Sequence, residues 1–131
     1  MLPNLIFVDT ETTGLGPEDR LIQLAFTTNK GELLDMRFNP GRPISFEAMA
    51  VHHITEEMVK DMPAFKGSQG YADLVTRLEN HIFVAHNAPF DLRMLEREGI
   101  PRPKWVIDTQ RVAKHIITVE DRHALQYLRI S

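Results

Sequence analysis

The strongest constraint on the fold is a short apolar run, Leu5–Val8, followed at once by the two carboxylates of Asp9 and Glu11. An uninterrupted apolar run beside turn residues is typical of a strand buried on both faces. Carboxylates at positions i and i+2 of an extended chain project from the same face. No basic residue lies nearby in the sequence to neutralise them. Because carboxylate oxygens are the preferred ligands of hard divalent cations, the stretch predicts a buried strand that ends in half of a metal site.

The same residues have a simpler explanation. Strand ends often carry Asp, Thr and Gly because these residues begin turns, and a turn capped by Asp9 would need no metal. For an isolated Asp-x-Glu pattern this explanation is the stronger one. The metal site is favoured here by the longer run Asp-Thr-Glu-Thr-Thr-Gly and by a second acidic segment downstream.

Composition limits the classes of function. A chain of 131 residues with 43% hydrophobic and 25% charged residues is typical of one soluble globular domain. The net charge of −3 means that any site for a polyanion is local or assisted by metal. Cysteine is absent, which excludes disulfides and thiolate metal sites and favours a cytoplasmic location. No signal segment and no apolar run of membrane-spanning length is found, so no membrane partner is expected.

The first third of the chain predicts an antiparallel sheet. The segment Arg20–Thr28 alternates and is rich in residues that favour strands, and Asn29–Glu32 supplies a hairpin turn. The segment Leu33–Asn39 predicts a third strand. Three strands joined by short turns pair in antiparallel fashion.

The rest of the chain alternates helices with strands. Short helices are expected at Phe46–Val51 and Glu56–Lys60, before an ordered series of helix, strand, helix, strand, helix and helix: Tyr71–Asn80, His81–His86, Pro89–Glu98, Trp105–Ile107, Asp108–Ile116 and Arg122–Ile130. This order predicts an α/β fold with a mixed five-stranded sheet, antiparallel over its first three strands and then parallel, with helices on both faces. No repeat or linker divides residues 1–131.

A second acidic segment, His86–Asp91, repeats the order of strand, sharp turn and carboxylate. With Pro89 at the first helical position, Asp91 lies in the first turn of a helix, where an acidic residue stabilises the helix dipole by about 0.3–1 kcal/mol without any metal. Ligands of open α/β sheets nevertheless collect at the carboxyl ends of strands. Asp9, Glu11 and Asp91 converging there would need cations, as in two-metal phosphoryl transfer.

These motifs resemble a known family. Asp9–Gly14 and His86–Asp91 are similar to the first two motifs of the DEDD superfamily of 3′–5′ exonucleases, which has a ribonuclease H-like fold. Pro43–Thr55 resembles the segment between those motifs, and Ile107–Thr109 resembles the next strand. The likeness is greatest to the DEDDh (DnaQ-like) branch, to exonuclease X-like and proofreading members, and covers essentially all 131 residues.

The resemblance implies a set of site residues. Two Mg²⁺ or Mn²⁺ ions would be held by Asp9, Glu11 and Asp91, with Asp9 bridging both. The residues that match positions contacting the terminal nucleotide are Thr10, Leu15, Glu47, Ala48, His52, His86, Asn87 and Phe90. Leu15 would wedge the terminal base, although Leu15 and Phe90 are equally well explained as core side chains.

The third motif of DEDDh members, His-x-x-x-x-Asp, is not found. His115 is followed at that distance by Glu120, and His123 by Leu128. No general base is therefore identified, and the sequence is expected to end before the family's last helix. With three carboxylates instead of four we expect weaker metal binding, and without a positioned base hydrolysis is expected to be about 10²–10⁴-fold slower or absent. The other histidines are expected to be structural or on the surface: His53, His81 and His115.

Three functions follow, in order of preference. The first is a metal-dependent 3′–5′ exonuclease that releases nucleoside monophosphates from DNA, single-stranded DNA preferred, with a DNA polymerase or another replication or repair protein as partner. The second is a module that binds a nucleic-acid 3′ end without chemistry. The third is a haloacid-dehalogenase-like phosphatase with Asp9 as nucleophile, although that family requires Asp where Glu11 stands.

Overall fold

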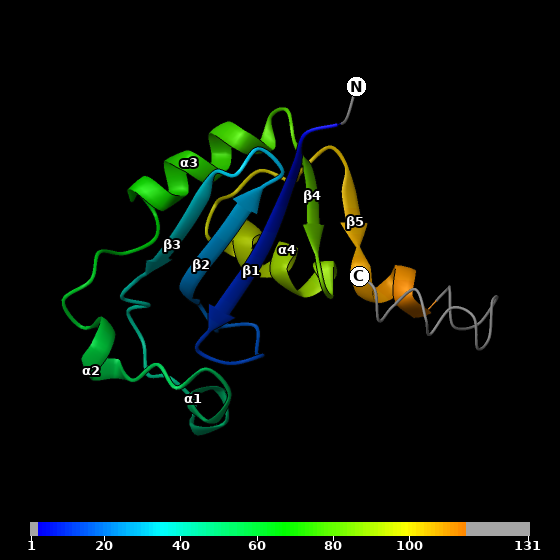
Figure 1. Cartoon of the computed structure of the whole chain (residues 1–131). Helices are drawn as coiled ribbons and strands as arrows, with labels where there is room; N and C mark the ends of the chain where they lie inside the picture. The colour runs from blue at the N-terminus through cyan, green and yellow to red at the C-terminus, as the bar shows by residue number, and fades with distance from the viewer. Residues whose placement is uncertain (1–2, 115–131) are drawn as a thin grey trace.

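The computed structural model of this chain describes residues 3–114 (Figure 1). Its elements in chain order are β1 (Leu5–Thr12), β2 (Leu21–Thr28), β3 (Leu33–Arg37), α1 (Phe46–His52), α2 (Glu56–Val59), α3 (Gln69–Leu78), β4 (Ile82–Ala85), α4 (Ala88–Arg97) and β5 (Val106–Asp108). A further helix begins at Thr109 and is described to Lys114. The predicted helix at 122–130 and the end of the one predicted from Asp108 lie outside the described residues.

The sheet has the predicted topology. Its strand order is β3-β2-β1-β4-β5, with β1 at the centre. β1 pairs antiparallel with β2 and β2 with β3, whereas β1–β4 and β4–β5 are parallel. The predicted mixed sheet, antiparallel and then parallel, is therefore confirmed. This order places the carboxyl ends of β1 and β4 beside each other.

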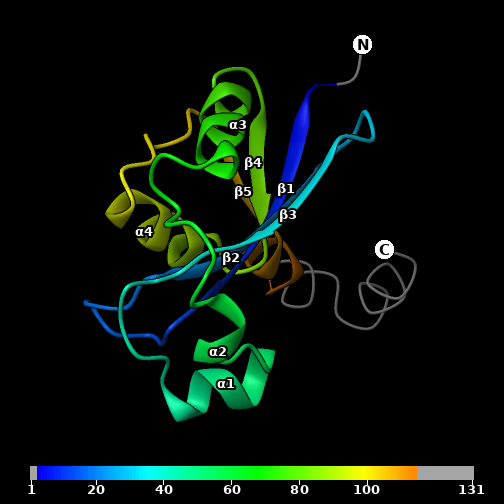
Figure 2. The same cartoon turned by 90° about the vertical axis from the view of Figure 1, so that its left-hand side faces the viewer.

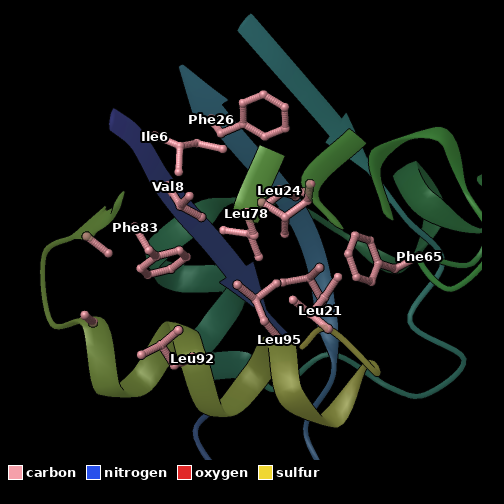
Figure 3. Packing of buried hydrophobic residues seen from close by; sticks show 14 of the residues in the cluster. Ile6, Val8, Leu21, Leu24, Phe26, Phe65, Leu78, Phe83, Leu92 and Leu95 are labelled. Atoms are coloured by element: carbon pink, nitrogen blue, oxygen red, sulfur yellow. The ribbon is translucent and has the colours of Figure 1, made fainter. Parts of the chain in front are cut away.

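The core fills the space between one face of the sheet and the helices α3 and α4. Side chains of β1, β2 and β4 point toward Leu78 of α3 and Leu92 and Leu95 of α4 (Figure 3). Burying each such aliphatic side chain stabilises the fold by roughly 1.5–3 kcal/mol. Seen from the side, α3 and α4 lie on one side of the sheet, and the helix that begins at Thr109 starts on the other (Figure 2).

The other face of β1 is more open than its sequence suggested. Ile6 and Val8 are buried, but Phe7 is 41% exposed, so the expectation of a run buried on both faces is wrong at Phe7. The physical reason is the strict alternation of a strand, which turns Phe7 away from α3 and α4. β1 also continues past the apolar run to Thr12.

The helices α1 and α2 lie beyond the carboxyl end of β1, away from α3 (Figure 1). They are held by a separate apolar cluster of Ile22, Ile44, Ile54 and Val59. Ser45 caps α1 by accepting a hydrogen bond from the backbone N–H of Ala48, as expected for a serine at that position. This small cluster packs α1, through Ala48 and Met49, against Ile22 of β2.

Several predicted boundaries are displaced by one or two residues. α3 begins at Gln69 instead of Tyr71, because the hydroxyl of Ser68 caps its first turn. α4 begins at Ala88, which makes Pro89 the second helical residue and not the first. Among residues 3–114, no helix is long and apolar enough to cross a membrane.

Candidate active site

Asp9 and Glu11 lie at the carboxyl-terminal end of β1 and share the face opposite to the core. Asp9 is exposed and Glu11 is half-buried. Thr10, which lies between them, and Thr12, which follows Glu11, are buried on the other face. The alternation predicted from the i and i+2 spacing is therefore present. Burial raises the pKa of Glu11, the charge of Asp9 raises it further, and His52 lowers it. Two acidic groups thus lie close enough to interact at one strand end.

Asp91 lies in the first turn of α4 and is only 5% exposed. Its Oδ1 accepts a hydrogen bond of 2.5 Å from the hydroxyl of Thr10. Burial raises the pKa of Asp91 to about 7; the bond from Thr10 lowers it, while the negative charges of Asp9, Glu11 and Asp108 raise it. Asp91 is thus buried within the negative potential of the acidic groups of β1.

These three side chains offer oxygen donors alone, which is the ligand chemistry of a hard divalent cation. Among residues 3–114, however, no three acidic or histidine side chains are gathered into a metal-binding group. Asp91 is engaged by Thr10 instead. Burial and the neighbouring carboxylates disfavour the charged form of Asp91, and among residues 3–114 the hydroxyl of Thr10 is the one group that favours it. A bound cation would favour the charged form further, so the surroundings of Asp91 fit a cation. The predicted metal site therefore stays a prediction.

A cleft of about 490 Å³ opens beside Glu11. That volume is within the range of small-molecule sites, roughly 300–1,000 Å³. Of the residues predicted to contact a nucleotide, the cleft is lined by Thr10, Leu15, Glu47, Ala48, His52 and Phe90. These residues come from β1, the loop after it, α1 and α4, so the cleft brings together segments far apart in the sequence.

The other two predicted contact residues lie outside this cleft. Nδ1 of His86 is 3.1 Å from the hydroxyl of Thr109, and His86 lines a hollow on the open face of the sheet together with Asp9. Asn87 adopts a left-handed conformation with φ of 66°, and its backbone N–H donates to Asp108 at 2.9 Å. The structure therefore places both residues in the turn before α4.

The loop that follows β1 is closed by the carboxylate of Asp19. This carboxylate accepts hydrogen bonds of 2.7 Å from the Thr13 hydroxyl and 2.7 Å from the backbone N–H of Gly16. Burial alone would raise the pKa of Asp19, but these bonds and the charges of Arg42 and Arg97 outweigh it and hold the pKa below its ordinary value. Leu15, which is 85% exposed, lies in this closed loop and lines the cleft.

The same loop is fastened to the end of α4. The guanidinium of Arg97 donates to the carbonyl oxygens of Gly16 at 2.9 Å and Asp19 at 3.1 Å. The buried carboxylate of Glu98 accepts two hydrogen bonds from Arg20 and one from the backbone N–H of Leu21. Because the first turn of α4 carries Phe90 and Asp91, these contacts connect the cleft's loop to the helix that holds both residues.

His52 has both ring nitrogens occupied. Nδ1 accepts from the backbone N–H of Ile54 at 3.0 Å, so Nε2 carries the proton and donates to the carbonyl of Thr12 at 3.0 Å. His52 therefore fixes α1 to the end of β1. Two other expectations are confirmed: His53 is exposed at the end of α1, and buried His81 is bonded to Arg77 and Asn80.

The cleft also contains residues that the sequence did not single out as site residues: Thr12, Gly14, Asp19, Ser45 and Val51. Thr12 and Gly14 belong to the acidic motif, so its continuation along β1 was a usable signal. Asp19 carried none, because its role depends on how the loop folds back onto Thr13.

The chain matches the exonuclease family RNase_T over residues 6–129. A DNA polymerase III subunit epsilon-like protein of Rhodobacter capsulatus is 38% identical over 145 residues, which cover 97% of this chain and 20% of that protein. The DNA polymerase III subunit epsilon of Rickettsia prowazekii is 36% identical over 100 residues, which cover 71% of this chain and 43% of that protein. This chain thus spans less than half the length of these relatives.

Solved structures agree with this assignment. Exonuclease X in complex with 5′-overhanging duplex DNA is 31% identical, with a TM-score of 0.63, over 86% of this chain and 63% of that one. Exonuclease I without ligand has a TM-score of 0.75 over 92% of this chain and 32% of that one, and at 17% identity it supports the fold alone. By its motifs, its ribonuclease H-like sheet and these matches, the chain belongs to the RNase_T exonuclease family, in the DEDDh 3′–5′ branch that its sequence predicted.

Proposed function

We propose that this chain is a metal-dependent exonuclease domain that removes nucleotides from the 3′ end of DNA, with single strands preferred. The observation that carries the proposal is the cleft of about 490 Å³, in which six predicted nucleotide-contacting residues meet beside Glu11. The exonuclease family and the relatives named above support it. A DNA polymerase partner is part of the proposal, because relatives are named as subunits of DNA polymerase III.

In this proposal Asp9, Glu11 and Asp91 hold Mg²⁺ or Mn²⁺, two ions per site. Bound divalent ions would stabilise the attacking and leaving oxygens of phosphodiester hydrolysis. The chain's own residues would place the strand end: Leu15 against the terminal base, and Glu47, Ala48 and Phe90 along the wall of the cleft. Thr10 holds Asp91 through its hydroxyl.

The alternative is a module that binds a 3′ end without cleaving it. One observation favours it: the single histidine of the cleft, His52, uses both ring nitrogens in structural hydrogen bonds, so among residues 3–114 the cleft offers no histidine as general base. The phosphatase alternative has no support from the family match.

The test is release of labelled nucleoside monophosphate from 3′-labelled single-stranded DNA in Mn²⁺, with Asp9→Asn and Asp61→Asn as matched variants. Asp61 is an exposed carboxylate outside the cleft. We expect slow release by the wild type and by Asp61→Asn, and none by Asp9→Asn. Tight binding of the 3′ end with no metal-dependent release would favour the binding module instead.

A further inference from the structure

A second hollow lies on the other side of α4 from the cleft. Its volume is about 430 Å³, and three arginines line it: Arg93, Arg102 and Arg111. They come from α4, from the link before β5 and from the helix that begins at Thr109. Three cations around one hollow are notable in a chain whose net charge is −3. We call this place the arginine hollow.

Two of these arginines have no acidic partner among residues 3–114. Within the described part of the chain, the guanidinium groups of Arg93 and Arg111 make no ion pair and no hydrogen bond. Arg102 is 3.1 Å from Glu96, but the side chains of this pair are 70% and 44% exposed. Such an exposed pair contributes little to stability, so an incoming anion can replace Glu96 at little cost.

Of the described residues that line the hollow, the one other carboxylate is that of Asp108, which is already satisfied by backbone groups. Asp108 accepts from the backbone N–H of Asn87 at 2.9 Å and of Gln110 at 3.1 Å. Burial alone would raise the pKa of Asp108, but hydrogen bonds from these groups and from the backbone of Ala88 and Arg111 hold it below its ordinary value. The negative charge of Asp108 therefore serves the ends of two helices and leaves the guanidinium groups available.

The backbone holds the three arginines in fixed places. Arg93 is in the middle of α4, and the backbone of Arg111 is anchored by Asp108. Arg102 lies between Pro101 and Pro103, which restrict the backbone on either side of it. Guanidinium groups recognise phosphate through paired N–H donors, and fixed attachment points reduce the entropy lost on binding.

We propose that the arginine hollow binds a backbone phosphate of the nucleic-acid strand whose 3′ end lies in the cleft. This inference rests on the proposed function. The connection is the first turn of α4, where Pro89 lines the arginine hollow and the next residue, Phe90, lines the cleft. A strand that leaves the cleft past Phe90 meets the hollow on the far side of one helical turn, which favours nucleic acid over an acidic protein segment.

The test measures binding of a long oligothymidylate as a function of salt, in Ca²⁺ to avoid hydrolysis, by the wild type and by R93A/R111A. Each neutralised phosphate of a single strand contributes about 0.7 to the slope of log affinity against log salt, so the double variant, which loses one phosphate site, should lose about 0.7 from that slope. The matched control is K30A/R37A, which removes two exposed charges near β3, away from the hollow. It should keep the slope, and a dinucleotide, too short to reach the hollow, should bind wild type and R93A/R111A equally.

The outcomes separate the two proposals. If the wild type prefers a free 3′-hydroxyl to a 3′-phosphate end but R93A/R111A keeps the wild-type slope, the arginine hollow is not a phosphate site and the proposed function stands. If R93A/R111A keeps the wild-type slope but loses the binding of an acidic peptide that the wild type shows, the inference is overturned in favour of a protein partner. If the wild type shows no preference for a free 3′-hydroxyl, both proposals fail.

Discussion

Gly14 is the position at which one added methyl group tests the loop that follows β1. A Cβ built there would lie 2.6 Å from Oδ2 and 2.9 Å from Cγ of Asp19, closer than such atoms can approach. Asp19 cannot move aside freely, because its carboxylate is bonded to Thr13 and Gly16. Hydrogen bonds to a charged group contribute about 1.5–3 kcal/mol each, so partial loss of both should make Gly14→Ala cost about 2–4 kcal/mol of the free energy of unfolding.

The assay is urea denaturation of a double-mutant cycle. Asp19→Ala alone should cost at least as much, because it removes both hydrogen bonds completely. In the Asp19→Ala background, Gly14→Ala should cost no more than about 0.5 kcal/mol, the effect of a surface substitution without a special contact. In a control background that lacks a different carboxylate, Asp35→Ala, its full cost should remain. Equal costs of Gly14→Ala with and without Asp19 would refute the reasoning.

Four further predictions concern the loop, the helix and the cleft. The pKa of Asp19 is lower in the folded state than its unfolded value of 3.8, so this carboxylate stabilises the fold above pH 3.8, and the stabilisation is lost as the pH falls through the folded-state pKa. Asp19→Asn should therefore flatten the decline of the urea midpoint at acid pH. Glu98→Ala should cost about 2–3 kcal/mol through its lost bonds to Arg20 and Leu21, whereas Glu96→Ala should stay within about 0.5 kcal/mol in the same assay. Leu15→Ala should leave the urea midpoint unchanged, since Leu15 is 85% exposed, but should weaken 3′-end binding measured by fluorescence anisotropy. Mn²⁺ should raise the Tm of the wild type and not that of Asp9→Asn, because a ligand stabilises the state that binds it.

Local patterns predicted most of the fold. The alternation of 20–28, the turn at 29–32 and the Gly and Pro residues around α4 were sufficient to predict a sheet that is first antiparallel and then parallel. Boundaries were less predictable, because they depend on individual caps: Ser68 starts α3 early, and the left-handed Asn87 lets α4 begin at Ala88. The exposure of Phe7 depends on which face of the sheet the helices cover. The residues around β1 carry no information about that choice.

The site was predicted only in part, because some of its contacts follow from local patterns and others join distant segments of the chain. The acidic pair of β1 follows from strand alternation, and six cleft residues follow from the family resemblance. The fastening of the loop by Arg97 and Glu98 was not predictable, because it joins residues that lie far apart in the sequence. Arg97 binds backbone carbonyl groups that any residue could supply, and Glu98 binds the side chain of Arg20. The arginine hollow likewise depends on three segments meeting at the flank of α4.

The most direct test of the central claim is calorimetric titration of Mn²⁺ into the wild type and into four single variants. If Asp9, Glu11 and Asp91 share the cation, then Asp9→Asn, Glu11→Gln and Asp91→Asn should each weaken binding at least tenfold. The variant Asp61→Asn should bind as the wild type does. Mn²⁺ binding that is unchanged by Asp91→Asn would contradict the account, because α4 would then contribute nothing to the metal site at the end of β1.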